Sequence, residues 1–469
     1  MEKFFKIKER GSSFKAEIIG GLTTFMAMAY ILMVNADMFT AAGVSYGAVY
    51  IATAISAVVG TLIMALLANL PLGLASGMGA NAFFVFTVVG SFGFSYANAL
   101  LFVLADGVIF ILLTVTGLRK TIFNAIPQPV KAAIPAGIGL FIAFLGFQKS
   151  GLVVNDDSTL VGLHSFNLMS DSVSWSQIMP ILVALLVLVA IAAMSKKKIK
   201  GAILWGILGG TALYYVFSFT ISGFDYSAFT EMNSIGDSFK SFYNEAFLAV
   251  FTKGFDFTDY LAVEGHTVFG LVIAFISTAL AFCLVDMFDT MGTLYGACRG
   301  GGLLVKNEKG EEEVPNMNRA MLADAVATTV GAACGTSTVT TFVESSSGVA
   351  AGARTGFASL ITAGMFFIAM FLSPLTTIIP SAAYAAALIY VGILMISCVK
   401  DIDWSDPEIA LPAFSVITFM PFTYSISYGI AFGILTYVLV KLFTGKVKEI
   451  SISTWVILAL FILMFLTTH

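Results

Sequence analysis

GTSTVTTFVESSSGVAAGARTG, residues 335–356, is the stretch on which the expected fold depends. It lies within a very apolar chain, yet its β-branched run Thr338–Thr341 favours an extended backbone over a helix. The segment from Glu344 to Ala353 can form a short helix, with Glu344 in its first turn. Non-helical backbone is tolerated at membrane depth only where protein buries it or where it lines a cavity. The stretch therefore predicts a broken membrane segment beside a polar site.

A second broken segment is predicted in the first half of the chain. Residues 71–86 read PLGLASGMGANAFFVF, again an apolar stretch interrupted by glycine and followed by a possible half-helix. Gly77 and Gly79 would let the backbone approach a ligand, and the first N–H groups of a half-helix are free donors. A matched pair of interrupted segments in two halves is a strong sequence pointer to a transporter's binding site.

The composition indicates an all-α integral membrane protein. The chain has 469 residues, of which 58% are hydrophobic and 11% charged, and its mean hydropathy is +0.94. Soluble proteins carry about 25% charged residues. The four cysteines have no CxxC spacing and the three histidines are scattered, so neither a disulfide framework nor a metal site is expected. No cofactor is expected either.

Nothing in the sequence indicates an enzyme or a nucleic-acid-binding protein. The chain contains neither HExxH nor GxSxG, and no nucleophile is paired with a base. The RGGG run at 299–302 lacks the Lys-Ser/Thr of a phosphate-binding loop, so it is interpreted as a linker.

Fourteen apolar segments are long enough to cross a bilayer, which needs roughly 17–25 residues. Because seven is odd, the second group of seven enters from the opposite side, and the halves form inverted repeats. Their third segments, both interrupted, would meet near the midplane. The expected segments are 16–40, 46–68, 72–90, 96–118, 127–147, 176–194, 201–220, 266–296, 319–334, 335–352, 355–373, 377–398, 408–423 and 425–443.

The distribution of basic residues supports this topology, with the N-terminus in the cytoplasm. Of the 24 Lys and Arg residues, 21 fall on the inside and only Lys149, Lys240 and Lys253 outside. The basic N-terminus followed by an apolar run resembles a signal peptide on paper, but the run continues to Phe39 and is interpreted as the first span. The apolar stretch 454–467 either lies in the interface or forms one more span; the sequence leaves both open.

Three carboxylates within the apolar segments are candidate functional groups. Asp286, Asp289 and Glu344 would together cost roughly 8–10 kcal/mol if they faced lipid, so they must face a polar cavity or each other. Asp286, Asp289, Thr290 and Thr293 recur at i, i+3, i+4 and i+7, which predicts one polar stripe on a helix. The alternatives are that the two aspartates only link neighbouring helices and that Glu344 is only a helix cap.

Three further polar residues have less specific interpretations. Asn81 offers both a donor and an acceptor to a ligand, or else it forms a hydrogen bond between helices. Asp106 and Asp324 are interpreted as pairing inside the helix bundle.

Four stretches resemble the AzgA-type purine permeases, the guanine/hypoxanthine/adenine branch of the nucleobase–cation symporters. They are GGLTTFMAMAYILMVN (20–35), GMGANAFF (77–84), VDMFDTMGTL (285–294) and the opening stretch 335–356. The resemblance covers nearly the whole chain. It implies proton-coupled uptake of a purine base by an elevator-like movement of a core domain against a gate domain, usually in a homodimer of the cell membrane.

The resemblance also implies domain boundaries. The core would comprise 16–118 and 266–373, and the gate 119–220 and 374–444. Residues 1–15 would be a cytoplasmic N-terminus, 221–265 an extracytoplasmic loop and 445–469 a C-terminal apolar segment.

The site residues expected from these motifs fall into two sets. Substrate contacts are expected from Asp286, Glu344, Asn81, Gly79, Ala80, Phe342, Thr341 and Thr290, and proton coupling from Asp286, Glu344 and Asp289. A carboxylate accepts the N–H groups of a purine, and Phe342 or Phe83 could stack on its ring. The preference among hypoxanthine, guanine and adenine stays open.

A rival interpretation keeps the fold and changes the cargo to an anion of the sulfate or bicarbonate type. Two half-helix N-termini would suit an anion. Three acids around the site, with no cationic residue among them, argue against it.

Overall fold

Nine helices among the described residues are long and apolar enough to cross a membrane. The computed structural model describes residues 1–117, 126–169, 173–222, 229, 234–263, 267–306 and 312–467. A helix or a broken helix lies at each of the apolar segments expected from the sequence. Four shorter apolar helices stand outside the set of nine: Met78–Ser91, Gly356–Met370, Pro407–Phe422 and Ile452–Leu463. The chain is therefore a multi-pass, mostly helical membrane protein.

Most helices in the first half of the chain are long and nearly continuous. The helices of this half are α1 (Glu2–Phe5), α2 (Phe14–Met28), α3 (Tyr30–Thr40), α4 (Tyr46–Ile63), α5 (Met78–Ala82), α6 (Tyr96–Thr116), α8 (Gln128–Lys149), α9 (Trp175–Lys196) and α10 (Ala202–Phe217). Three π-helical turns extend them: η1 (Met64–Ala68), η2 (Phe83–Ser91) and η3 (Ser218–Ser222).

Short helices fill the described part of the polar stretch between the halves, and long ones follow. The short ones are α12 (Ile235–Ser241), η4 (Phe242–Ala246), α13 (Ala249–Thr252) and α14 (Thr258–Leu261). The second half contains α15 (Val268–Gly301), α16 (Met317–Cys334), α17 (Ser345–Ala350), α18 (Gly356–Met370), α19 (Ser373–Thr376), α20 (Ser381–Ile396), η5 (Ser397–Asp401), α21 (Pro407–Phe422), α22 (Ile426–Phe443), η6 (Val447–Glu449) and α23 (Ile452–Thr467).

The two broken segments meet as an antiparallel pair of short strands. β1 (Leu74–Ser76) pairs with β6 (Val339–Thr341), with Ala75 opposite Thr340. Both strands are fully buried, and each leads towards a short helix, α5 or α17. The extended backbone predicted from the β-branched run at Thr338–Thr341 is confirmed, as is the meeting of the two interruptions.

Side chains of neighbouring helices satisfy the outer edges of this two-stranded ribbon. On the β1 side, the Thr61 hydroxyl of α4 accepts from the Leu74 N–H at 2.9 Å and donates to its carbonyl at 3.0 Å. On the β6 side, α16 provides the acceptors: Thr328 Oγ1 for the Val339 N–H and Asp324 Oδ1 for the Thr341 N–H. Since no backbone donor can be left unpaired in hydrocarbon, these side chains allow extended backbone at this depth.

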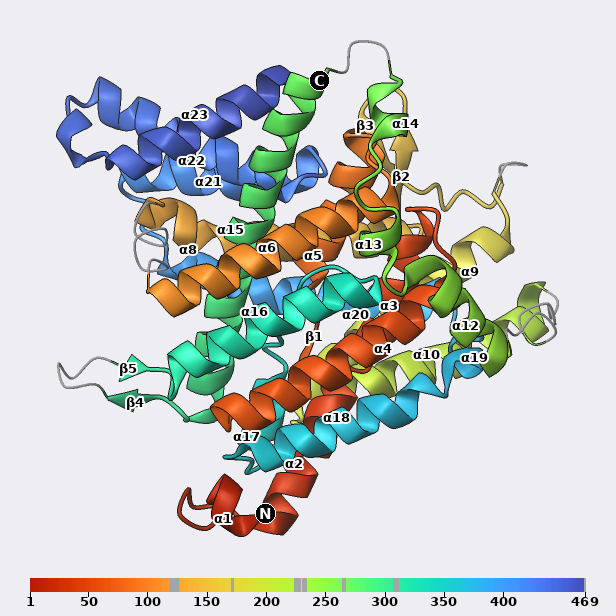
Figure 1. Ribbon diagram of the computed structural model, residues 1–469. Helices are drawn as coiled ribbons and strands as arrows, with labels where there is room; N and C mark the ends of the chain where they lie inside the picture. Colours follow the sequence, from red (N-terminus) through yellow and green to blue (C-terminus); the bar gives the residue numbers. More distant parts are fainter. Residues whose placement is uncertain are drawn as a thin grey trace.

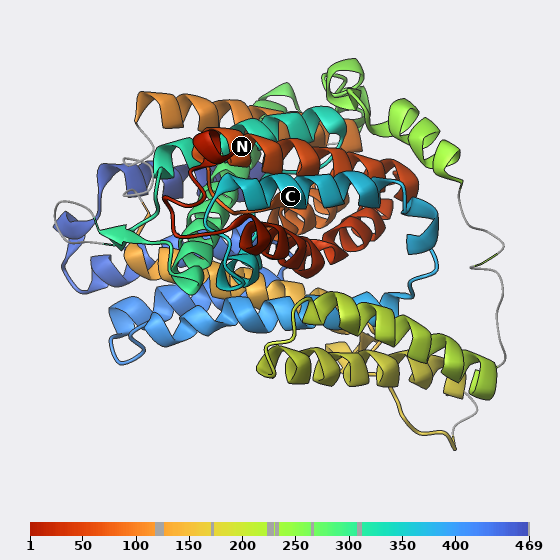
Figure 2. The same ribbon diagram turned by 90° about the horizontal axis from the view of Figure 1, so that it is seen from below.

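The helices pack into two groups, each with members from both halves. In one group α2 and α4 contact α18, and α4 and α6 contact α16. In the other, α8 packs against α20 and α21, and α9 packs against α10 and α20. Figure 1 shows the long helix α15 (green) crossing the molecule, and Figure 2 shows red, orange and teal helices on one side with olive and blue helices on the other.

Close contact between α2 and α17 depends on two glycines. A Cβ atom on Gly348 would lie 2.0 Å from the Thr24 Oγ1 atom, and one on Gly20 would lie 2.5 Å from the Ala353 Cβ atom. Glycine at both positions lets the backbones approach, as at other helix contacts in membranes. This contact fixes the half-helix α17 against the first span.

Two β-hairpins lie outside the helical core and were not predicted from the sequence. β2 (Val153–Asp156) pairs with β3 (Leu160–Leu163), and β4 (Val305–Lys306) pairs with β5 (Glu312–Glu313). Their residues carry no strong alternation of apolar and polar positions, which is the usual strand signal.

Candidate substrate-binding site

A cavity of about 470 Å³ lies where the two broken segments meet α15, α8 and α20. One wall comes from the first span, the broken segments and α15: Tyr30, Gly77, Met78, Gly79, Asp289, Gly292, Thr293, Gly296, Thr340, Thr341, Phe342, Val343, Glu344 and Ser346. The other wall comes from α8, α20 and η5: Ile134, Pro135, Ile138, Ile142, Val391, Leu394, Met395, Ser397 and Cys398. The two acids that line the cavity, Asp289 and Glu344, both lie on the first wall.

Glu344 is held in the cavity by Tyr30 of the first span. The Tyr30 hydroxyl donates to Glu344 Oε1 at 2.8 Å. Glu344 is also the N-cap residue of α17, but its side chain accepts no capping hydrogen bond from that helix. The interpretation of Glu344 as only a helix cap does not fit this geometry, because its carboxylate bonds to Tyr30 and Glu344 lines the cavity.

Asp289 is the second carboxylate of the cavity, and it lies beside the start of α5. A Cβ atom on Gly77 would be 3.4 Å from Asp289 Oδ2 and 2.8 Å from the Thr340 Cγ2 atom. Only a glycine leaves this space open. The first wall thus combines an acid of α15 with the backbone of the first broken segment.

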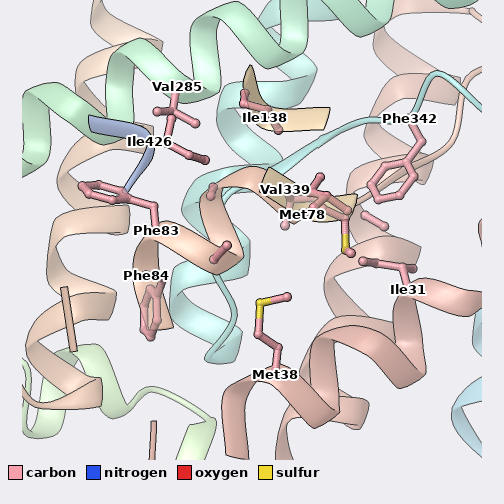
Figure 3. Close-up of a cluster of buried hydrophobic side chains, with 14 of the residues drawn as sticks. Ile31, Met38, Met78, Phe83, Phe84, Ile138, Val285, Val339, Phe342 and Ile426 are labelled. Atoms are coloured by element: carbon pink, nitrogen blue, oxygen red, sulfur yellow. The ribbon is translucent and has the colours of Figure 1, made fainter. Parts of the chain in front are cut away.

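Of the two aromatic rings considered from the sequence, only Phe342 lines the cavity. Phe83 is fully buried and packs on Phe282, with ring centroids 4.6 Å apart. Figure 3 shows Phe83 and Phe342 at opposite ends of the hydrophobic cluster around Met78 and Val339. Of these two rings, Phe342 is therefore the one that a flat ligand in the cavity can contact.

The position of Asp286 differs from the prediction. Asp286 is not among the residues that line the cavity; it is 1% exposed, and its Oδ2 atom accepts a hydrogen bond from Thr328 of α16. Residues three apart on a helix point roughly 60° apart, so Asp289 reaches the cavity while Asp286 faces α16. The face of α15 that lines the cavity consists of Asp289, Gly292, Thr293 and Gly296. It shares only Asp289 and Thr293 with the predicted polar stripe.

Three more predicted contacts lie outside the cavity lining: Asn81, Ala80 and Thr290. Asn81 is fully buried, and its Oδ1 atom accepts from the hydroxyls of Ser76 and Ser337. Thr290 donates to Asp324 Oδ2 at 2.6 Å. These side chains join the broken segments to one another and to α16, so the alternative interpretation of Asn81, a structural hydrogen bond, fits the geometry. Gly79, Thr341, Phe342 and Glu344 line the cavity.

The two remaining acids, Asp106 and Asp324, are both fully buried but differ in their partners. Asp324 accepts from Thr290, from the Thr341 N–H at 3.0 Å and from the Thr341 hydroxyl at 3.4 Å, as expected of an acid that pairs inside the bundle. No N–H or hydroxyl group among the described residues donates to Asp106, whose hydrogen-bonding neighbour is the thiol of Cys283. Asp324 is thus firmly paired inside the bundle, whereas Asp106 has only a weak donor beside it.

Sequence reasoning missed Tyr30 and the whole second wall. A tyrosine within the apolar run 20–35 was the available signal for Tyr30. Residues such as Ile138, Val391 and Met395 gave no signal, because an apolar residue in a span usually faces lipid or core. Within the described ranges, no group of three His, Cys, Asp or Glu side chains is arranged to hold a metal ion.

The arrangement suits a flat, neutral, polar-edged ring. Two carboxylates on one wall accept hydrogen bonds, and an apolar wall covers a ring face. None of the described lining residues is Lys, Arg or His, so the cavity offers no side chain to neutralise an anion.

The chain resembles known proteins over nearly its whole length. Residues 15–432 match the model described as "Permease family". The chain is 42% identical to the guanine/hypoxanthine permease PbuO of Bacillus subtilis, over 95% of this chain and 96% of that protein. It is 39% identical to the putative permease MJ0326 of Methanocaldococcus jannaschii (99% and 98% covered) and 34% identical to the adenine permease AdeP of Escherichia coli (100% and 97% covered).

Solved structures share the fold at low sequence identity. The transmembrane domain of the cyanobacterial bicarbonate transporter BicA superposes with a TM-score of 0.60 at 16% identity, covering 88% of this chain and 97% of that one. The murine Solute Carrier 26 family member A9, an anion transporter, gives 0.57 at 14% identity, covering 92% and 69%. At such identity the likeness shows the fold alone. The sequence matches, in contrast, show that the chain belongs to the permease family and, within it, resembles the purine permeases; it is a membrane transporter and not an enzyme.

Proposed function

We propose that this chain takes up purine nucleobases together with protons. The observation that carries the proposal is the pair of carboxylates, Asp289 and Glu344, in a cavity where two broken membrane segments meet. Relatives named as guanine/hypoxanthine and adenine permeases support the class of cargo.

In the proposed complex, the purine lies between the two walls of the cavity. Glu344 and Asp289 accept N–H bonds from the edge of the base, and the backbone N–H groups at the start of α5, around Gly79, answer its ring nitrogens. Phe342 stacks on one face, and Ile138 with its apolar neighbours covers the other. A site built on hydrogen bonds rejects analogues that lack a partner.

The proposed coupling ion is the proton, carried by the acids Asp286, Asp289 and Glu344. One proton that crosses a potential of 100 mV supplies about 2.3 kcal/mol, which corresponds to roughly a 50-fold concentration ratio. This is enough to collect dilute purines.

The proposed movement is an elevator-like displacement of a core (16–118 with 266–373) against a gate (119–220 with 374–444). It fits the two packing groups, each of which mixes the halves, and the cavity between α8, α20 and the broken segments. We further propose fourteen spans as a seven-plus-seven inverted repeat, the N-terminus in the cytoplasm, and a homodimer in the cell membrane.

The alternative cargo is an anion, since the structural relatives include a bicarbonate transporter and an anion transporter. The two cavity carboxylates disfavour it, because an anion beside Asp289 and Glu344 would be repelled at close range.

The test is uptake of labelled hypoxanthine, guanine and adenine by vesicles that contain the purified chain. A pH gradient, acid outside, should drive accumulation, and a protonophore should abolish it. Uptake of bicarbonate or sulfate in place of purines would overturn the cargo, and purine uptake that needs sodium but ignores the protonophore would overturn the coupling ion. A competition panel of the three bases ranks the cargo.

A further inference from the structure

Asp106 has a very unusual environment for a carboxyl group. It is 0% exposed, and no N–H or hydroxyl group among the described residues donates to either of its oxygens; its hydrogen-bonding neighbour is the weakly donating thiol of Cys283. Gly107, the next residue of α6, allows this depth, because its Cβ position would be 2.6 Å from the Thr329 Oγ1 atom of α16. An ionised carboxylate left unpaired in such a place is very costly, so a buried one stays protonated.

The titratable groups around Asp106 are acids or a thiol. From α15, the thiol of Cys283 faces it and Asp286 lies within electrostatic range; from α16, Asp324 does. The other elements packed on α6, namely α13 and η2, contain no titratable residue. None of the ion pairs within the described ranges involves these acids. The Oδ1 atom of Asp286 also lacks a partner. Three buried carboxyl groups within electrostatic range of one another, with no cation paired to them among the described residues, cannot all be ionised.

A hydrogen-bond chain leads from the cavity wall to this cluster. Thr340 lines the cavity, and its hydroxyl lies 2.9 Å from that of Thr290. Thr290 donates its only hydroxyl hydrogen to Asp324 Oδ2 at 2.6 Å. Thr340 must therefore be the donor to Thr290, and both hydroxyl hydrogens point from the cavity towards Asp324.

We propose that Asp106, Asp286 and Asp324 form a proton-holding site behind β6, separate from the substrate cavity and filled from it through Thr340 and Thr290. In the transfer, Thr290 passes its hydroxyl proton to Asp324, Thr340 passes its own to Thr290, and a hydronium ion in the cavity gives a proton to Thr340 and leaves as water. The carboxylate gains one proton, and both hydroxyls are neutral again, with their hydrogens now turned towards the cavity. This inference deepens the proposed proton coupling and rests on it.

The site has a direct way to influence the cavity. Asp324 accepts from the Thr341 N–H, and Asp286 accepts from Thr328, which in turn accepts from the Val339 N–H. Asp324 thus contacts the outer edge of β6 directly, and Asp286 reaches it through Thr328; residues Thr340 and Thr341 of β6 form part of the cavity wall. A protonated Asp324 is a weaker acceptor for the Thr341 N–H than an ionised carboxylate. Protonation of Asp324 would therefore weaken the hydrogen bond that fixes β6 in the cavity wall.

The experiment compares two transport modes in vesicles. Purine exchange, with equal pH on both sides and no potential, moves labelled hypoxanthine without net proton transfer, whereas accumulation under an imposed pH gradient needs it. Asp106→Asn should keep exchange within about twofold of the unsubstituted chain. Its accumulation should fall from tens-fold to about onefold, and purine addition should no longer acidify the vesicle lumen.

Two further variants make the result decisive. Asp324→Asn keeps an oxygen for the Thr341 N–H but cannot take a proton, so it should show the same split; Asp403→Asn, in an exposed loop, should keep both modes. Full gradient-driven accumulation by Asp106→Asn would overturn the proposal. The proposal would also be overturned if both Asp106→Asn and Asp324→Asn lost exchange as well as accumulation, since the acids would then be needed only for the fold. Absence of purine exchange in the unsubstituted chain would instead refute the proposed function.

Discussion

The two broken segments have the same geometry but different chemistry. β1–α5 and β6–α17 pair strand to strand, and each supplies part of the cavity wall. The first presents Gly77, Met78 and Gly79 to the cavity, and its outer edge is held by the neutral hydroxyl of Thr61. The second presents Glu344, and its outer edge is held by the carboxyl group of Asp324.

The two segments therefore contribute different properties to the site. The first, neutral segment (β1–α5) lets a ligand approach its backbone closely, whereas the second, acidic segment (β6–α17) and its neighbour Asp324 provide carboxyl groups that can gain or lose a proton. Removal of the carboxylate of the second segment should therefore reduce transport more than a substitution that conserves volume in the first.

The largest effect is expected from Glu344→Gln. A hydrogen bond to a charged group is worth about 1.5–3 kcal/mol, so the initial rate of purine uptake should fall roughly 100-fold. The matched change in the neutral segment is Met78→Leu, which keeps the volume and should cost only a few-fold. Uptake rates, normalised to the amount of protein in the membrane, make the comparison. Equal losses in the two variants would show that the segments do not differ as described.

Tyr30→Phe should have the next largest effect. It removes the donor that lies 2.8 Å from Glu344 Oε1, and cavity water replaces it only in part. We expect the KM for purine uptake to rise about 10-fold. Tyr50→Phe is the control, because the Tyr50 hydroxyl donates to the Ala369 carbonyl at the same distance of 2.8 Å but away from the cavity. It should lower thermal stability and leave KM unchanged; a KM shift in the control would count against a specific role of Tyr30.

Gly77→Ala tests the neutral segment itself. The added methyl group would be 2.8 Å from the Thr340 Cγ2 atom, so the β1–β6 pair must shift. Overpacking typically costs 1–3 kcal/mol, and a turn of the Thr340 side chain away from the added methyl group relieves part of it, so uptake should fall about fivefold. Gly209→Ala is the matched control, since a Cβ atom there meets nothing within 4 Å. Unchanged uptake in Gly77→Ala would mean that the strand pair is more adaptable than its packing indicates.

The smallest effect is expected from Phe342→Leu. Ring stacking is worth about 0.5–1.5 kcal/mol, and leucine keeps part of the contact, so the loss should be about 0.5–1 kcal/mol and the KM should rise roughly two- to fivefold with little change in maximal rate. Phe83→Leu, which loses its contact with Phe282, should instead lower the unfolding temperature. The opposite pattern, with KM sensitive to Phe83, would place the ring-binding surface on the first segment.

The breaks in the membrane segments could be predicted from the sequence because their physical causes are local. Thr338–Thr341 is β-branched, 71–86 is interrupted by glycine, and an acid in hydrocarbon needs a polar surrounding whatever its neighbours are. These features indicated the extended stretches, the half-helices and a polar surrounding for Glu344, which lines the cavity.

The orientation of α15 about its own axis could not be predicted from the sequence. This orientation determines which of the two aspartates faces the cavity. Asp286 and Asp289 are both acids on one polar stripe, and only the packing of α16 and α6 determines that Asp286 turns away. The second wall could not be predicted either, since the apolar side chains of α8 and α20 look the same in sequence whether they face a ligand, lipid or protein.

The pairing of β1 with β6 also constrains how the chain is made. Strand Leu74–Ser76 is synthesised long before Val339–Thr341, and at about 5–20 residues per second the wait lasts tens of seconds. During that time its inner edge has no partner in the membrane, where an open strand edge is not tolerated. The first half must therefore pass through biogenesis with this segment in another conformation or sheltered by the insertion machinery, and only the arrival of the second half completes it.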